Sequence, residues 1–263
     1  MPYISIITPV HDRPHYLEEA VDSIQKQSYV DWEHIIIDDG SSSAYTKEVL
    51  QKISALPKTA VYRTENRGPG AARNYGIENA KGDYILTLDD DDKWHPEFIV
   101  MALDIFEKKP KAGVVTAWVQ EFGTAERILQ TKGGDVKNFL VENNSVHGMF
   151  KKEYWAACGK YDEHMTAYED WDLWLRITAM GYLVEVVPHP FFFYRIHRHT
   201  SRQREAREKH LELFRYIVEK NRKIYQEHVV DAVCQLEERT IDITKDFESL
   251  NWRHKLKRII GND

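Results

Sequence analysis

The chain has 263 residues, of which 42% are apolar and 12% aromatic, and its formal net charge is −6. This apolar content excludes a disordered chain, and the length suits one large α/β domain with an appendage or two small domains. No apolar stretch approaches the ~18 residues that a membrane helix needs, and the first ten residues do not have the pattern of a secretory signal. Two cysteines cannot supply a disulfide framework, so a reducing compartment, the cytoplasm, is expected.

Short β-rich runs alternate with helical patterns through the first half of the chain. We expect strands over 3–8, 33–37, 60–62, 84–88 and 112–119, and helices over 14–24, around 49–53, over 70–80 and over 95–106. This alternation predicts an α/β fold with a mainly parallel central sheet flanked by helices on both faces. Ligands bind such sheets at the carboxyl ends of the strands, so the chemistry is expected just after Thr8, Ile37, Leu88 and Val119.

The pattern is less regular beyond residue 120. We expect helices over 151–157 and 170–180, short strands over 183–187 and 191–195, and one long helical pattern over 202–238. The chain is therefore divided into a body, residues 1–201, and a C-terminal helical extension, residues 202–263.

Four successive aspartates, Asp89–Asp92, follow the strand predicted over 84–88. Carboxylates so close together repel one another strongly at low dielectric unless positive charge lies among them. A solvated acidic loop is one interpretation. The position at the ligand-binding edge favours another, because Mg²⁺ and Mn²⁺ prefer carboxylate oxygens together with ligand phosphates. Asp89 and Asp91 can approach one ligand if the turn is tight.

Two loops near this edge have the composition of a nucleotide site. Asp38–Ser41 follows the second strand, and its acids either cap a helix or accept hydrogen bonds from a base or ribose. Asn66–Asn74 combines small residues, a helix start and fixed cations, as a phosphate cradle does. The loop after the first strand, Pro9–Asp12, has no glycine, which argues against a Rossmann oxidoreductase.

Two later segments carry ionisable groups. Tyr168–Arg176 places acids at the start of a predicted helix, where they either complement the helix dipole or present a general base. Tyr194–Ser201 places two histidines and two arginines after a short strand. Such a group binds phosphate or a metal, or is structural.

Taken in order, these five segments resemble the inverting glycosyltransferases of family 2, which have the GT-A fold with a Rossmann-like sheet; the resemblance spans residues 3–201. It implies a GT-A catalytic domain over 1–201, with a nucleotide-binding half over 1–119 and an acceptor-binding half over 120–201. The implied reaction moves a sugar from a nucleotide-diphosphate sugar, most often a UDP-sugar, to a hydroxyl of a saccharide or lipid-linked saccharide in cell-surface polysaccharide synthesis. It would proceed by a single displacement assisted by Mn²⁺ or Mg²⁺.

The resemblance also implies the site residues. Asp170 would be the general base, Asp91 and His197 would hold the metal, and Glu169 and Trp171 would face the acceptor. Residues assigned to the nucleotide are Pro9, Val10, His11, Asp39, Asn66, Gly70, Arg73, Asp89 and Asp90. Within that set Asp39 would accept a hydrogen bond from the base and Asp89 would face the ribose. Asp90 is an extra acid where many family members have a small residue, and its side chain is expected to point to solvent.

Two other functions stay open. A polyprenyl-phosphate sugar synthase would transfer the sugar to a phosphate, which needs no base, so the pair Glu169–Asp170 argues against it. A non-catalytic module that binds nucleotide sugars would keep the fold without the reaction. No nucleic-acid partner is expected.

The C-terminal part of the chain is basic. Residues 195–263 carry 16 Lys and Arg against 12 Asp and Glu, although the whole chain is acidic. Basic and apolar residues interleave over 251–260. As a helix, this segment would rest on the inner face of a membrane as a peripheral contact, or pack against the body or the second copy of a homodimer.

Overall fold

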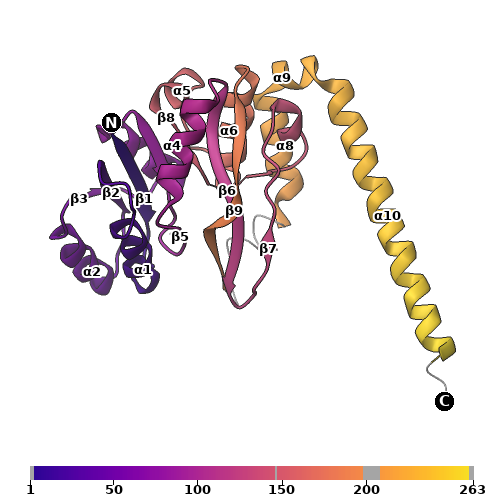
Figure 1. The fold of residues 1–263 in the computed structure, drawn as a ribbon, viewed down its shortest axis with the longest axis horizontal. Helices are drawn as coiled ribbons and strands as arrows, with labels where there is room; N and C mark the ends of the chain where they lie inside the picture. The colour runs from indigo at the N-terminus through magenta and orange to yellow at the C-terminus, as the bar shows by residue number, and fades with distance from the viewer. Residues whose placement is uncertain (1–2, 146, 198–207, 261–263) are drawn as a thin grey trace. The chain divides into compact units, whose positions relative to one another are not determined.

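The computed structural model describes residues 3–145, 147–197 and 208–260, and the side chains of 246–260 lie outside this description (Figure 1). The chain divides into two compact units, Met1–Lys220 and Asn221–Asp263. The first unit holds the sheet. The second unit contains α9 (Arg222–Glu227) and α10 (Val229–Ile260).

In the described residues, nine strands form one sheet in the order β3-β2-β1-β4-β8-β6-β9-β5, with β7 beside β6. The strands are β1 (Ile4–Val10), β2 (Trp32–Asp39), β3 (Thr59–Thr64), β4 (Tyr84–Thr87), β5 (Lys93–Trp94), β6 (Ala112–Gly123), β7 (Ile128–Leu129), β8 (Met149–Lys151) and β9 (Leu183–Ile196). The four strands β3, β2, β1 and β4 are neighbours in this order and pair in parallel, and β6 and β9 also pair in parallel. Strand β8 runs antiparallel to both of its neighbours, β4 and β6.

The first unit also contains helices, and all but the last of them connect these strands. They are α1 (Pro14–Gln25), α2 (Ala44–Ser54), α3 (Pro69–Asn79), α4 (Phe98–Lys108), the 3₁₀ turn η1 (Val136–Phe139), α5 (Lys152–Ala157), α6 (Glu169–Ala179) and α8 (His210–Lys220). Pro14 and Pro69 stand in the first turns of α1 and α3, where a missing N–H is harmless and a fixed φ favours the helix. The helices expected near residues 14–24, 49–53, 70–80 and 95–106 are thus confirmed.

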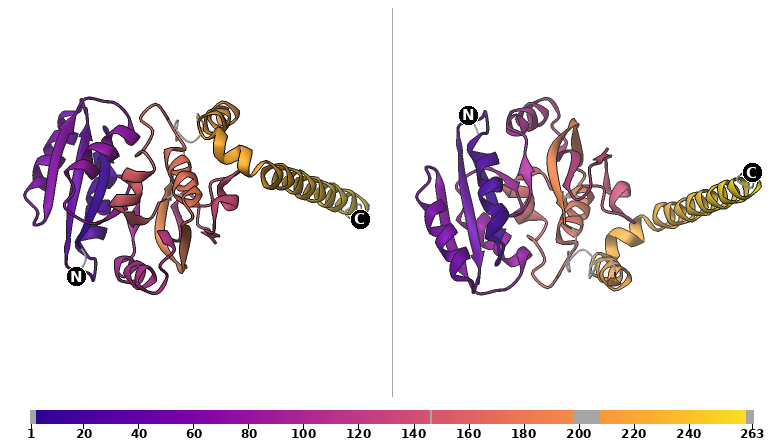
Figure 2. Two further views of the ribbon diagram at one scale, coloured as in Figure 1. Left: turned by 90° about the horizontal axis from the view of Figure 1, so that it is seen from above. Right: turned by 90° about the horizontal axis from the view of Figure 1, so that it is seen from below.

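Both faces of the parallel strands are covered, as Figure 2 illustrates. On one face Ile36 of β2 packs with Leu17 of α1 and Val49 of α2. On the other face Gly76 of α3 lies so close to the sheet that a Cβ atom there would come within 2.7 Å of Ile7. This arrangement explains why β2 is buried along its whole length, including its polar side chains, around the apolar run Ile35–Ile37. The predicted α/β class is confirmed.

The second half of the body differs from the expectation in one strand. The runs 183–187 and 191–195 are a single strand, β9, because both pair in parallel with β6. The pairing is irregular between the two runs, where Pro188 and Pro190 lie. Proline has no N–H to donate to a ladder, so it breaks the sequence pattern without ending the strand.

The long helical pattern expected over 202–238 is also divided. Residues 202–207 lie outside the described residues, and the remainder forms α8, α9 and the start of α10, with breaks at Asn221 and His228. The segment 251–263 continues α10 as far as Ile260, and what its side chains contact lies outside the described residues. In the part of the chain that is described, no helix is both long enough and apolar enough to cross a bilayer.

Candidate functional site

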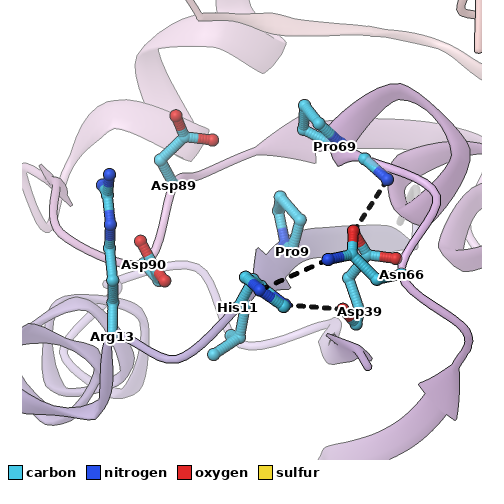
Figure 3. Close-up of a pocket in the computed structure, with 10 residues that line it drawn as sticks. Pro9, His11, Arg13, Asp39, Asn66, Pro69, Asp89 and Asp90 are labelled. Carbon is cyan, nitrogen blue, oxygen red and sulfur yellow. Dashed lines mark hydrogen bonds between the residues drawn. The ribbon is translucent and has the colours of Figure 1, made fainter. Parts of the chain in front are cut away.

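A cavity of about 240 Å³ lies where the predicted nucleotide loops meet, at the carboxyl ends of β1, β2 and β4 (Figure 3). It is lined by Pro9, Val10, His11, Arg13, Asp39, Asn66, Gly68, Pro69, Asp89 and Asp90. The lining contains every residue that the sequence assigned to the nucleotide except Gly70 and Arg73. Parallel pairing brings these loops together, because β1 pairs with both β2 and β4 and all three strands end at one edge.

Asp39 at the end of β2 ties two of the loops together. Its carboxylate accepts hydrogen bonds from the main-chain N–H groups of Arg67 and Gly68, each at 2.9 Å. Its main-chain oxygen lies 2.7 Å from Nδ1 of His11, and Nε2 of His11 lies 3.3 Å from the amide of Asn66. Figure 3 shows this chain of contacts along one side of the cavity. Asp39 therefore shapes the pocket that was expected to hold the base.

Arg73 lies in α3, outside the cavity lining, and is almost fully buried. Its guanidinium donates to Asp89 and to Glu169, both at 2.6 Å. Burial lowers the pKa of Arg73, but these two carboxylates outweigh it and raise the pKa, so the cation is kept. Arg73 thus bridges the aspartate run and the start of α6. Its expected position near the base and the diphosphate stays a prediction.

Gly70, the other residue outside the lining, lies at the start of α3. A Cβ atom there would come within 2.8 Å of the main-chain oxygen of Asp162. Glycine is therefore needed for close packing of α3 against the segment before α6. Its expected part in shaping the nucleotide loop stays a prediction.

The aspartate run forms a buried turn, which differs from a solvated acidic loop. Asp90 is 6% exposed, contrary to the expectation that its side chain points to solvent. Asp92 is more buried still: Oδ1 accepts the main-chain N–H of Arg195 at 2.8 Å, and Oδ2 has no hydrogen-bond partner among the described residues. Burial, followed by the neighbouring Asp91 and Asp89, raises the pKa of Asp92 well above its usual value.

The side chain of Asp91 contacts a histidine and an arginine. Its Oδ2 atom lies 2.9 Å from Nε2 of His197 and 3.2 Å from a guanidinium nitrogen of Arg13. The two residues that the sequence assigned to the metal are thus brought together from positions 106 residues apart. Arg13 was not singled out, although its place directly after the first strand was a signal.

A second group of potential metal ligands lies on the same turn. One ligand atom from each of Asp89, Asp92 and His147 falls within 4.8 Å of the other two. His147 is buried in the loop before β8, and its Nδ1 atom lies 3.3 Å from the hydroxyl of Thr87. The sequence offered no motif around His147. Only the antiparallel pairing of β8 with β4 brings it to the site.

Asp170 stands in the first turn of α6. One carboxylate oxygen accepts the main-chain N–H of Trp171 at 2.8 Å, and the other accepts the side-chain amide of Asn143 at 3.2 Å. Burial among protein atoms, followed by the adjacent Glu169 carboxylate, raises the pKa of Asp170 to about 6, against the opposing effects of His147 and Arg73. A carboxyl group with such a pKa can accept a proton near neutral pH.

The two residues assigned to the acceptor, Glu169 and Trp171, are buried beside Asp170. Glu169 pairs with Arg73, and the indole N–H of Trp171 donates to the main-chain oxygen of Phe139 at 2.6 Å. At 1% exposure, Trp171 has no free surface for an acceptor. Its position reflects the aromatic helical face that packs into the core.

The sequence profile of glycosyl transferase family 2 matches residues 5–157, more than half of the chain. An uncharacterised glycosyltransferase of Rickettsia typhi is 30% identical over 207 residues, which cover 71% of this chain and 63% of that protein. The putative teichuronic acid biosynthesis glycosyltransferase TuaG of Bacillus subtilis is 35% identical over 119 residues, covering 44% of this chain and 47% of TuaG. The chain thus spans less than two thirds of the length of these relatives.

Solved structures support the fold. Residues 1–349 of S. aureus TarS, in complex with UDP-GlcNAc, superpose with a TM-score of 0.66 at 16% identity, over 76% of this chain and 60% of that one. The complex of the same TarS fragment with UDP gives a TM-score of 0.63 at 17% identity, over 74% of this chain and 60% of that one. The expected GT-A fold is therefore confirmed, and with the profile match it follows that the chain belongs to glycosyl transferase family 2.

Proposed function

We propose that the chain transfers a sugar from a nucleotide-diphosphate sugar, with UDP as the expected nucleotide, to a hydroxyl group of a saccharide or lipid-linked saccharide. One observation carries this proposal. The cavity of the nucleotide loops is joined, through Asp89, Arg73 and Glu169, to a carboxyl group at Asp170 whose pKa is raised to about 6. The ligands named for the TarS structures and the pathway named for TuaG support the same substrate class and cell-surface polysaccharide synthesis.

In this proposal the nucleotide lies in the cavity formed by residues within 1–119, and residues within 120–201 bind the acceptor. Pro9, Val10 and His11 form the wall against the base. Asp39 fixes the loop of residues 66–68 through its two main-chain hydrogen bonds. A base-binding wall made largely of main chain and proline is rigid, so little ordering entropy is lost on binding.

The chemical step is a single displacement with inversion. The acceptor hydroxyl gives its proton to the carboxylate of Asp170, and the acceptor oxygen bonds to the anomeric carbon. The bond from that carbon to the phosphate oxygen breaks, and its electron pair leaves with the nucleoside diphosphate. Arg73 and Asn143 hold the first turn of α6, through Glu169 and Asp170 respectively, so that the base is oriented before the acceptor binds.

The residues of the aspartate turn fit a divalent cation. Carboxylate oxygens and imidazole are suitable ligands for Mn²⁺ or Mg²⁺, and the buried Oδ2 of Asp92 has no hydrogen-bond partner among the described residues. We propose Asp91 and His197 as the residues that hold the metal, with Asp89, Asp92 and His147 as the competing set. When bound, the cation would stabilise negative charge on the departing diphosphate.

The proposed location is the cytoplasm, with residues 251–263 in contact with the inner face of a membrane or with a second copy. Flotation of the full chain, and of a chain ending at residue 250, with anionic phospholipid vesicles tests this contact. If both proteins float equally, the contact with the membrane is excluded. If both proteins have the same oligomeric state in solution, the contact with a second copy through this segment is excluded.

The donor is tested by thermal unfolding with UDP, GDP, dTDP and their sugars, in the presence of Mn²⁺ or Mg²⁺. A nucleotide at 100 times its Kd should stabilise the fold by about 2.7 kcal/mol. Nucleotide release with saccharide acceptors, polyprenyl phosphate and EDTA then tests the reaction. Binding without sugar transfer or hydrolysis would favour a non-catalytic module, and transfer only to polyprenyl phosphate would replace the hydroxyl acceptor.

A further inference from the structure

Helix α8 lies beyond the residues matched by the family profile, yet its side chains contact the segment that carries Asp170. The ring of Phe214 stacks on Trp171, with centroids 5.5 Å apart and planes at 15°. Nδ1 of His210 lies 3.1 Å from the hydroxyl of Tyr168, the residue that precedes α6. These contacts hold the chain on both sides of Glu169–Asp170.

The last residue of α8, Lys220, contacts two carboxylates that are themselves buried. Its ammonium lies 2.8 Å from Oδ2 of Asp172 and 2.6 Å from Oδ2 of Asp162. Asp172 is fully buried in the first turn of α6 and also accepts a hydrogen bond from Arg176 at 2.6 Å. Two carboxylates in such a place need cations, because an uncompensated buried charge is strongly unfavourable.

Asp162 belongs to a segment that packs against the nucleotide loop. Its main-chain oxygen occupies the space that a side chain on Gly70 would need. The next residue, Glu163, accepts hydrogen bonds from Arg67 at 2.5 Å and from Asn74 at 3.0 Å. Lys220 therefore joins two elements at once: the helix turn that presents Asp170, and the segment against which the nucleotide loop is seated.

We propose that Lys220 is a positioning residue, which sets the spacing between Asp170 and the nucleotide loop by bridging Asp172 and Asp162. The inference rests on the proposed function, in which Asp170 takes the proton of the acceptor. A displacement of about 1 Å in a catalytic group can lower the rate ~10²-fold. Lys220 is not assigned a contact with either substrate, since its partners Asp172 and Asp162 do not line the nucleotide cavity.

The test compares Lys220→Met with Lys220→Arg. Methionine keeps an apolar stem but removes the bridge, so kcat should fall about 10- to 100-fold while KM for the nucleotide sugar changes little. Arginine keeps the charge and can contact both carboxylates, so it should restore most of kcat. Lys108→Met, which removes an exposed pair with Asp104 in α4, is the matched control and should leave both constants unchanged.

Loss of stability is separated from loss of positioning by the double variant Asp162→Asn with Lys220→Met. It removes one of the two carboxylates and should recover part of the stability without recovering kcat. Unchanged kcat in Lys220→Met, or full recovery of kcat in the double variant, would overturn the inference. Asp170→Asn is measured alongside: turnover that survives it contradicts the proposed base, whereas an inactive Asp170→Asn beside a normal Lys220→Met contradicts the positioning role alone.

Discussion

The nucleotide side and the α6 side of the site hold their carboxylates by different means. Asp39 receives two main-chain N–H groups from the loop that it organises, so its partners are part of the backbone. Glu169 and Asp172, in α6, are held by side-chain cations. Arg73 of α3 pairs with Glu169, whereas Asp172 pairs with Lys220 of α8 and with Arg176 of α6 itself. Asp170 lies between them with one main-chain N–H and one amide.

This difference means that the two sides should respond differently to substitution of their side chains. Main-chain donors do not depend on the identity of the side chains that carry them, so they tolerate changes in distant side chains. Buried ion pairs depend on partners from several elements, and each lost partner leaves a charge uncompensated. Substitutions on the α6 side should therefore affect rate and stability more than those that leave the Asp39 loop intact.

The largest effect is expected from Asp170→Asn. An amide has nearly the same shape but cannot accept the proton, so turnover should fall about 10²- to 10⁴-fold, the usual contribution of a placed base. Affinity for UDP, measured by calorimetry, should be retained because the nucleotide loops are untouched.

The matched control is Asp104→Asn, an exposed acid in α4 whose partner is Lys108. It should keep full turnover. Near-normal turnover of Asp170→Asn would show that Asp170 is not the base. It would also contradict the expectation that the α6 side controls the rate.

Arg73→Met should have the largest effect on stability. Glu169 and Asp89 would lose the cation that bridges them at 2.6 Å, and breaking such a buried pair costs about 3 kcal/mol. Urea denaturation measures the free energy of unfolding.

Arg67→Met is the comparison, because its pair with Glu163 lies at the surface, with 65% of the arginine side chain exposed. It should cost less than about 1 kcal/mol. Equal losses in the two variants would contradict the view that the buried bridge supports the α6 side.

Asp91→Ala tests the metal. If Asp91 and His197 hold the cation, this variant should bind Mn²⁺ more weakly and lose about 10²- to 10³-fold in kcat/KM, as removal of one electrostatic group at a leaving oxyanion does. Mn²⁺ binding is followed by electron paramagnetic resonance. His147→Gln should bind the metal normally, and the reverse result would transfer the site to Asp89, Asp92 and His147.

The smallest expected effect is the change of kcat/KM with pH near neutrality. The pKa of Asp170 is raised to about 6 by burial and Glu169, with His147 and Arg73 opposing, so the protonated form dominates below that value. The base must be ionised, so kcat/KM should be constant above about pH 7 and fall tenfold per unit below pH 6. A profile that stays flat down to pH 5 would argue against this base.

The sequence by itself determined which residues gather at the carboxyl edge of the parallel strands, where the nucleotide is proposed to bind. Alternating strands and helices fix a parallel sheet, parallel strands end at one edge, and the motifs around Pro9, Asp39 and Asp89 directly follow such ends. Asp91 and His197 could be paired only through the family resemblance. The short strand of residues 183–187 could not be joined to its continuation, because Pro188 and Pro190 interrupt the pattern.

Only the tertiary structure decided which side chains pair with the acids. Arg73 reaches Glu169 across 96 residues, His147 reaches Asp89 from an antiparallel strand pair, and Lys220 reaches Asp172 from a helix with no motif of its own. Sequence periodicity describes neighbours along one element, whereas the partner of a buried charge depends on which elements pack together. For that reason the sequence located the acidic residues, and the packing of α3, α6 and α8 determined their partners.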